Sequence, residues 1–259
     1  MILLHLGALH LADAEEISTP WHRLTPRSRV LCTVLLVFAI ALTPNGRWLT
    51  WAIYAGTIAA LILISRVNLH MLIRRVAVEC IFIGIVIVGT LFREGGHVVW
   101  QWGWLRVTSE GLMILGSVAT KAFLSLLVLN VLALTTSVPA LLHALINLKM
   151  PPLLVAILAS MYRYISVLSD EFTSMQRAAR SRNLFSNRTR QRTIIGNMFG
   201  SLFIRTYDRG ERVHQAMLAR GYQGLPPLAE VPQPKQRDTV AITFTCVVAL
   251  IGQAIYLGF

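Results

Sequence analysis

Apolar runs long enough to cross a lipid bilayer recur along this chain, and they limit the folds that it can adopt. Of its 259 residues, 55% are hydrophobic and 14% are charged. A soluble domain has about a quarter of its residues charged. An integral membrane protein is therefore the only class that fits. We expect an all-α fold with about five transmembrane helices and, in addition, long amphipathic helices at the cytoplasmic face.

Five segments are predicted to cross the membrane. The first two are shorter than the roughly 20 residues that a span needs, so we expect flanking residues to contribute. Pro44-Asn45-Gly46 between them predicts a tight turn. Residues 93–110 hold three tryptophans and suit an aromatic belt at the opposite interface. The predicted spans are approximately Val30–Thr43, Trp48–Ile64, Val76–Leu91, Leu112–Leu134 and Thr239–Phe259.

The charges of the loops predict the orientation of the chain. The loops before the first span and after the second are basic, and the positive-inside rule places basic loops in the cytoplasm. The N-terminus is then inside and the C-terminus outside. Residues 1–28 read as a short interfacial helix followed by a polar lead-in, and we expect no cleaved signal peptide. The arginines that set this orientation are Arg23, Arg27, Arg29, Arg66, Arg74 and Arg75.

The segment from Ser174 to Gly224 concentrates the charge of the protein. Between Ser174 and Tyr222 ten arginines and no lysine stand against Asp208 and Glu211, which is +8 of a formal net charge of +12. A basic segment binds either nucleic acid or the anionic cytoplasmic leaflet. Because the rest of the chain is so apolar, we expect the lipid bilayer as its partner and no nucleic acid.

Residues 151–183 predict one long amphipathic helix on the cytoplasmic face and not a further span. If this helix crossed the membrane, the arginine-rich segment would lie outside, against the positive-inside rule. It would also bury Arg163 near the middle of the bilayer, at a cost of about 2.5–3.5 kcal/mol on insertion scales. Its apolar positions alternate by four and three along one helical seam: Leu154, Leu158, Met161, Ile165, Leu168, Phe172 and Met175.

Two more helices complete the predicted cytoplasmic part. Residues 138–148 form a short amphipathic helix, and residues 190–220 form a long one, after which Gly221 stands where a left-handed cap is wanted. Residues 222–238 hold four prolines and read as a linker. We therefore divide the chain into residues 1–136, 137–224 and 225–259. The apolar stripe of the last long helix is Ile195, Met198, Phe199, Leu202 and Phe203.

Each long helix ends on an arginine with small neighbours, in Ala179-Arg180-Ser181 and in Ala219-Arg220-Gly221. Small neighbours let a helix end approach another protein closely, and arginine offers a planar fork of donors to carboxylates or carbonyls. A helix laid into a groove is a common recognition mode. The alternative interpretation is structural, because arginines near helix C-termini favour the helix dipole and basic cytoplasmic loops are common.

The paired motifs resemble the Ala-Arg-Ser/Ala-Arg-Gly signature of the transmembrane coupling subunits of energy-coupling-factor (ECF) transporters. The lead-in His22-Arg23-Leu24-Thr25-Pro26-Arg27-Ser28-Arg29 is similar to that family's approach to its first span, in the cobalt branch, CbiQ, in particular. The resemblance covers nearly the whole chain in order. One departure is Arg182-Asn183 after the first motif, where the family often continues with glycine.

The resemblance implies a subunit of the bacterial cytoplasmic (inner) membrane that is not an enzyme and binds no cofactor or metal itself. The two motifs would dock into two ATPase subunits, or into a homodimer, and these partners would hold ATP and Mg²⁺. A separate substrate-binding membrane subunit would hold the cargo, Co²⁺ for the cobalt branch. The residues implied to contact that subunit are Leu154, Leu158, Met161, Ile165, Leu168, Phe172, Ile195, Phe199 and Leu202.

Two alternatives stay open. The same coupling role can serve nickel or a vitamin, because the selective ligands should belong to another chain. A stand-alone membrane permease or enzyme would instead use polar residues within or beside the spans, such as Lys121 paired with Glu79, and His97, since a lysine inside a span is expensive unless paired. The histidines show no metal-binding motif. His5 and His10, near acidic residues, read as solvated interfacial residues.

Overall fold

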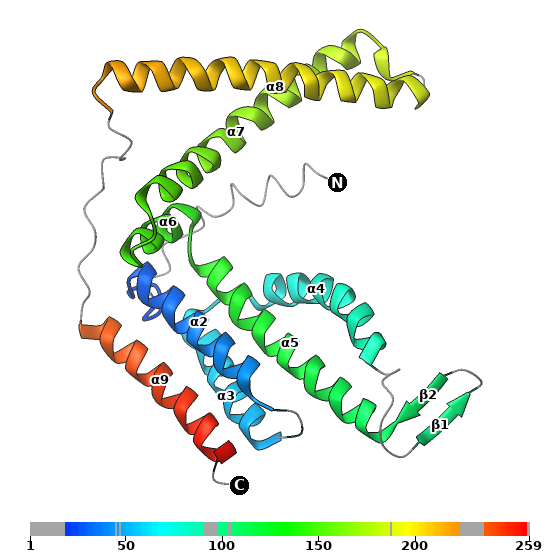
Figure 1. The fold of residues 1–259 in the computed structure, drawn as a ribbon, viewed down its shortest axis with the longest axis vertical. Helices are drawn as coiled ribbons and strands as arrows, with labels where there is room; N and C mark the ends of the chain where they lie inside the picture. The colour runs from blue at the N-terminus through cyan, green and yellow to red at the C-terminus, as the bar shows by residue number, and fades with distance from the viewer. Residues whose placement is uncertain are drawn as a thin grey trace. The chain divides into compact units, whose positions relative to one another are not determined.

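The computed structural model describes residues 19–44, 46, 48–90, 98–102, 105–186, 188–222 and 236–257, and most of these are helical (Figure 1). The predicted all-α class is confirmed. The apolar N-terminal run, with His5 and His10, lies outside the described residues, as does His97. The elements are α2 (Pro26–Leu42), α3 (Trp48–Ser65), α4 (Leu69–Thr90), β1 (Val98–Trp102), β2 (Leu105–Thr108), α5 (Ser109–Thr135), α6 (Val138–Asn147), α7 (Pro152–Ser181), the 3₁₀ turn η2 (Leu184–Ser186), α8 (Arg188–Ala219) and α9 (Gln236–Leu257).

The chain divides into two compact units. Unit 1 consists of Met1–Ala144 and Pro232–Phe259, and unit 2 of Leu145–Val231. The chain therefore leaves unit 1 within α6 and re-enters it shortly before α9.

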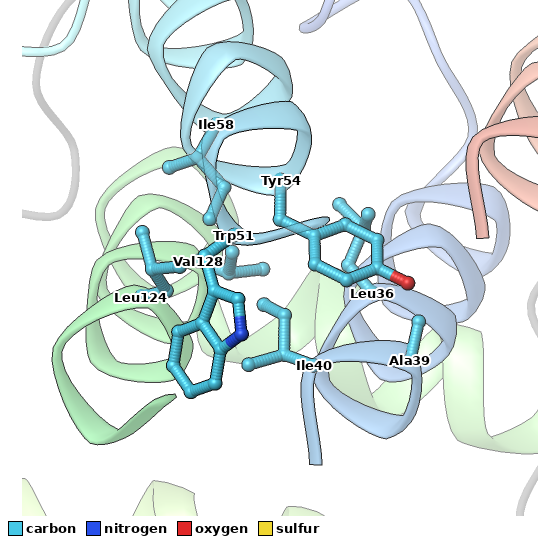
Figure 2. Close-up of a cluster of buried hydrophobic side chains, with 8 residues drawn as sticks. All are labelled: Leu36, Ala39, Ile40, Trp51, Tyr54, Ile58, Leu124 and Val128. Carbon is cyan, nitrogen blue, oxygen red and sulfur yellow. The ribbon is translucent and has the colours of Figure 1, made fainter. Parts of the chain in front are cut away.

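Unit 1 is a helical bundle in which α5 contacts α2, α3 and α4, while α9 packs against α2 and α3 (Figure 1). Its main core lies where α2, α3 and α5 meet. Figure 2 shows this core, with the rings of Trp51 and Tyr54 from α3 among aliphatic side chains. The other buried members are Leu36, Ala39, Ile40, Ile58, Leu124 and Val128.

Each of the five predicted spans coincides with a helix of unit 1. Three of these helices, namely α3, α5 and α9, contain segments long and apolar enough to cross a membrane. The other two do not reach that standard, because α2 has 17 residues and α4 carries Arg74, Arg75 and Glu79. Both nevertheless pack against α5 in the same bundle.

Helix α7 also meets the same standard of length and composition, although the sequence places it on the cytoplasmic face. We keep the interfacial assignment as a prediction on physical grounds. Arg163 stands in the first half of α7 and is exposed. In the second half, Glu171 forms ion pairs with Arg205 and Arg209 of α8, at 3.4 and 3.3 Å. Charged pairs of this kind belong in water or at a membrane surface and not in hydrocarbon.

The loops of unit 1 include the predicted turn at Gly46 and, in addition, a short β-hairpin. Gly46 has φ +88°, a left-handed value that favours glycine, as the predicted turn after α2 requires. Its N–H donates to Ser117 Oγ at 3.2 Å. The predicted aromatic belt contains an additional element, the two-stranded antiparallel hairpin of β1 and β2. Alternating β-branched and aromatic residues around Gly103 are the signal for it.

Candidate functional site

The first arginine motif lies in the last turn of α7. The helix ends at Ser181, and its cap is Arg182, whose N–H donates to the carbonyl of Ala178 at 3.3 Å. Asn183 follows in the left-handed region with φ +53°, and its N–H donates to the carbonyl of Arg180 at 2.9 Å. Asparagine tolerates this conformation better than most residues. Asn183 therefore supplies the left-handed residue that terminates α7.

The second motif forms the cap of α8 itself. Gly221 has φ +80°, and its N–H donates to the carbonyl of Leu218 at 2.9 Å. The N–H of Tyr222 reaches back to the carbonyl of Met217 at 3.0 Å. These two bonds make a complete Schellman motif, in which Arg220 is the cap residue and Gly221 supplies the left-handed position. The predicted cap at Gly221 is confirmed.

The two motifs are thus not structural copies of each other. Arg180 precedes its left-handed residue by three positions, whereas Arg220 precedes its own by one. An offset of two residues corresponds to about 200° around a helix. The two arginine side chains therefore project in different directions relative to the ends of their helices.

Arg180 and Arg220 are both exposed. Within the described part of unit 2, the ion pairs of the arginine-rich segment involve Arg205 and Arg209, which bind Glu171 and hold α8 to α7. Neither Arg180 nor Arg220 forms an ion pair there. The arginines of this segment therefore have different tasks: two stabilise the pairing of α7 and α8, and the motif arginines leave their guanidinium groups available.

The small neighbours of the two arginines differ in exposure. Ala179 is buried within the fold, so it serves the packing of unit 2. Ser181 is exposed, and its hydroxyl donates to the carbonyl of Ala178 at 2.9 Å. Ala219 and Gly221 are both exposed. The end of α8 therefore presents its motif more openly than the end of α7 does.

The apolar residues expected to contact a partner fall into two groups. In the first half of α7 the seam is open, since Leu154, Leu158, Met161 and Ile165 are exposed. In the second half, α7 and α8 pack on each other, because the rings of Phe172 and Phe199 stack with centroids 5.0 Å apart. Even so, 56% of Phe199 is exposed. Intermediate burial is found for Leu168, Ile195 and Leu202.

The structure gives Glu79 a partner other than the one suggested from sequence. The amide of Asn130 donates to Glu79 Oε2 at 2.7 Å. Lys121 lies nine residues earlier on α5, about 14 Å along the helix axis, and its ammonium stands over the ring of Trp51 at 5.7 Å. The suggested Lys121–Glu79 pair is therefore replaced by Glu79–Asn130 and by a cation–π contact.

The lead-in segment is far more buried than a basic loop would be. Arg29 had been counted among the loop charges, yet it lies in the first turn of α2 and is only 8% exposed. Its Nη1 donates to the carbonyl of Thr135 at 2.8 Å, and its Nη2 donates to the carbonyl of His22. Trp21 Nε1 adds a bond to Thr135 Oγ1 at 3.0 Å. The end of α5 is therefore fastened to the start of α2.

Asp238 bonds a third helix, α9, to the start of α2. It was assigned to the proline-containing linker, but it lies in the first turn of α9 and is 3% exposed. Its Oδ1 accepts hydrogen bonds from the N–H of Thr25 at 2.9 Å and from Ser28 Oγ at 2.8 Å. We call this set of residues the lead-in cluster: Trp21, His22, Thr25, Ser28, Arg29, Thr135 and Asp238.

His22 makes the stability of this cluster depend on pH. Burial, and secondarily the positive charge of Arg29, lower the pKa of His22 below its usual 6.5. Above that value the histidine is neutral in both the folded and the unfolded chain. As the pH falls through about 6.5 the unfolded chain binds a proton that the folded chain resists, so the free energy of unfolding decreases. In thermal unfolding between pH 8 and pH 5, we expect His22→Gln to reduce this acid-induced loss and His70→Gln, at an exposed position, to leave it unchanged.

Comparison with known proteins agrees with the features of this site. A family model described as CbiQ, cobalt transport protein, matches residues 18–231, which include the lead-in segment and both arginine motifs. The chain is similar to the energy-coupling factor transporter transmembrane protein EcfT of Brevibacillus brevis, with 31% identity over 216 residues, 78% of this chain and 80% of that protein. It is also similar to EcfT of Limosilactobacillus fermentum, with 27% identity over 245 residues, 89% of this chain and 91% of that protein.

A third relative, EcfT of Lacticaseibacillus paracasei, is 26% identical over 215 residues, 78% of this chain and 81% of that protein. The matched part of the chain runs from the lead-in segment through all helices up to the end of α8. The resemblance read from the paired motifs is thereby confirmed, and the chain belongs to the CbiQ family of membrane proteins.

Proposed function

We propose that this chain is the energy-coupling transmembrane subunit of a multi-pass ECF importer. In this role it catalyses no reaction. It transmits the ATP-driven motion of two cytoplasmic ATPase subunits to a separate substrate-binding membrane subunit, which then releases its cargo into the cell. The relatives named above are transmembrane proteins of energy-coupling factor transporters, and this supports the assignment.

The observation that carries the proposal is the pair of capped helix ends in unit 2. Arg180 and Arg220 stand at the C-termini of α7 and α8, they are exposed, and they form no ion pair within the described residues of the unit. An arginine in such a position can donate two parallel hydrogen bonds to a carboxylate or to carbonyl groups of a partner. Each arginine would dock into a groove of one ATPase subunit.

The different geometry of the two motifs affects which pair of ATPase subunits can bind. Because Arg180 lies within the last turn of α7 and Arg220 caps α8, the two docking surfaces differ in shape. A heterodimer of ATPases suits this asymmetry directly. A homodimer also fits if each copy meets its helix end at a different angle.

The exposed apolar residues in the first half of α7 would bind the substrate-binding subunit. Leu154, Leu158, Met161 and Ile165 present a continuous apolar stripe, and such stripes mark a site for a membrane or protein partner. Phe199 and the half-buried members at the crossing of α7 and α8 extend the same surface. Movement of the two helices would then be passed on to the bound subunit.

The cargo of the importer is proposed from the family description, which names cobalt transport. Co²⁺ would be held by the partner subunit, and ATP with Mg²⁺ by the ATPases. The described residues contain no group of three or more potential metal ligands. Nickel and vitamins remain alternative cargoes, since the names of the EcfT relatives mention no transported substrate.

The test is reconstitution of the chain with its neighbouring ATPase and substrate-binding subunits in vesicles. We expect ATP-dependent uptake of Co²⁺ that requires all three components and that exceeds the uptake of Ni²⁺. Uptake of a vitamin in place of a metal would keep the coupling role and change the cargo. Transport by this chain alone, without ATPase, would contradict the proposal and favour a stand-alone permease.

The permease alternative rested on a charged pair within the spans. Since Glu79 bonds with Asn130 and Lys121 lies over Trp51, the two residues no longer form one polar site. His97, the third residue of that alternative, lies outside the described residues.

A further inference from the structure

The lead-in cluster lies within unit 1 and holds the C-terminus of α5 and the N-terminus of α9 at the start of α2. The outgoing connection begins at Thr135, the last residue of α5, and continues through α6, within which unit 1 ends. The returning connection re-enters unit 1 at Pro232 and leads to Asp238 in the first turn of α9. Both helix ends that receive these connections are bonded to the start of α2.

The hydrogen bonds of the lead-in cluster involve charged side chains and are therefore costly to break. The guanidinium of Arg29 holds two backbone carbonyls at once, those of Thr135 and His22. The carboxylate of Asp238 accepts two donors from the first turn of α2. Hydrogen bonds to charged groups are stronger than neutral ones, and a buried charge that loses its partners is costly. The cluster therefore opposes fraying of α5 and α9 at these ends.

We propose that Arg29 is a positioning residue for energy coupling, which holds the outgoing end of α5 on α2 while Ser28 and Asp238 hold the returning end of α9. Motion of unit 2 that reaches unit 1 through the chain then moves the bundle as one body. Without the cluster, the same motion unwinds the last turn of α5 or the first turn of α9. This inference rests on the coupling function proposed above.

The test compares variants in the complete complex, with the ATPases and the substrate-binding subunit reconstituted in vesicles. For Arg29→Gln we expect assembly and ATP hydrolysis to persist while the cargo transported per ATP falls about tenfold, within the usual range of coupling energies. Arg29→Lys retains the charge but lacks the planar fork, so its ratio should be intermediate. Arg27→Gln, at an exposed position two residues away, should keep the ratio of the unaltered protein.

A structural control separates positioning from simple destabilisation. Val128→Ala opens a cavity in the core of unit 1, away from the cluster. It should lower the amount of complex without changing the cargo transported per ATP. If Arg29→Gln behaves in the same way, with an unchanged ratio, the proposal is wrong and Arg29 serves only stability.

If the Arg29→Gln protein does not accumulate in the membrane, a second variant, Ser28→Ala, tests the same proposal. Ser28→Ala removes one bond to Asp238 and little volume, so the protein should fold, and the cargo transported per ATP should fall by a few-fold. An unchanged ratio would overturn the proposal. If the proposed coupling function were wrong, the unaltered chain would neither bind the ATPases nor support ATP-dependent uptake. This outcome is distinct from an unchanged ratio in the variants.

Discussion

Replacing Arg180 or Arg220 with glutamate is expected to remove most of the bound ATPase when the chain is purified from membranes. An interfacial arginine of this kind contributes about 2 kcal/mol or more to binding, which is about thirtyfold in affinity. Reversal of its charge adds repulsion from the acceptor groups that it met. The double variant should recover no ATPase above background. The measurement is the ratio of ATPase to this chain after affinity purification.

The matched control for these variants is Arg192→Glu. Arg192 is exposed and belongs to the same basic segment, but it lies in the second turn of α8, outside both motifs. It should retain the ATPase and show the same level in the membrane. Equal losses in all three single variants would mean that the arginines act only through their summed charge. Arg180→Lys and Arg220→Lys should bind weakly, because lysine lacks the bidentate fork.

Replacing Gly252 with alanine is expected to destabilise the bundle of unit 1 more than other small substitutions in its helices. A methyl group at this position of α9 would collide with the hydroxyl oxygen of Tyr54 and lie 2.6 Å from its Cζ. Tyr54 is 1% exposed and belongs to the core of unit 1, so a shift of its ring would disturb that core (Figure 2). Overpacking of this kind costs about 1–3 kcal/mol. Thermal unfolding in detergent should show a lower midpoint.

Two further variants test this explanation. In Gly252→Ala combined with Tyr54→Leu, the smaller side chain makes room for the methyl group, so the two effects should not add. Gly56→Ala is the control, because a Cβ at Gly56 in α3 has no neighbour within 4 Å. That change should be neutral or stabilising by up to about 1 kcal/mol, the difference in helix propensity. If Gly252→Ala were equally harmless, the close approach of α9 to α3 would be wrong.

The helices and the motif positions were predictable because they depend on local sequence. The spans follow from runs of apolar residues, and the long helices α7 and α8 follow from their 3.6-residue periodicity. Gly221 was identified as a cap because only a left-handed residue can close a Schellman motif there. These patterns need no knowledge of distant parts of the chain.

The contacts that join distant segments were not predictable in the same way. By local sequence Arg29 is one more loop charge and Asp238 the last residue of a linker, since nothing local says that Arg29 bonds to the end of α5 and Asp238 to the start of α2. Thr25 and Asp238 are 213 positions apart in the sequence. Likewise, opposite charges favour a Glu79–Lys121 pair in the sequence, and no local pattern indicates the neutral partner Asn130.

Site-specific photo-crosslinking tests whether both capped helix ends of unit 2 contact the ATPases. A photoreactive residue is introduced at Ser181 beside Arg180, at Ala219 beside Arg220 and, as a control, at Gln191, all three of which are exposed. We expect crosslinks to an ATPase subunit from positions 181 and 219 and none from position 191. Crosslinks from all three positions alike, or to lipid alone, would contradict the docking of Arg180 and Arg220.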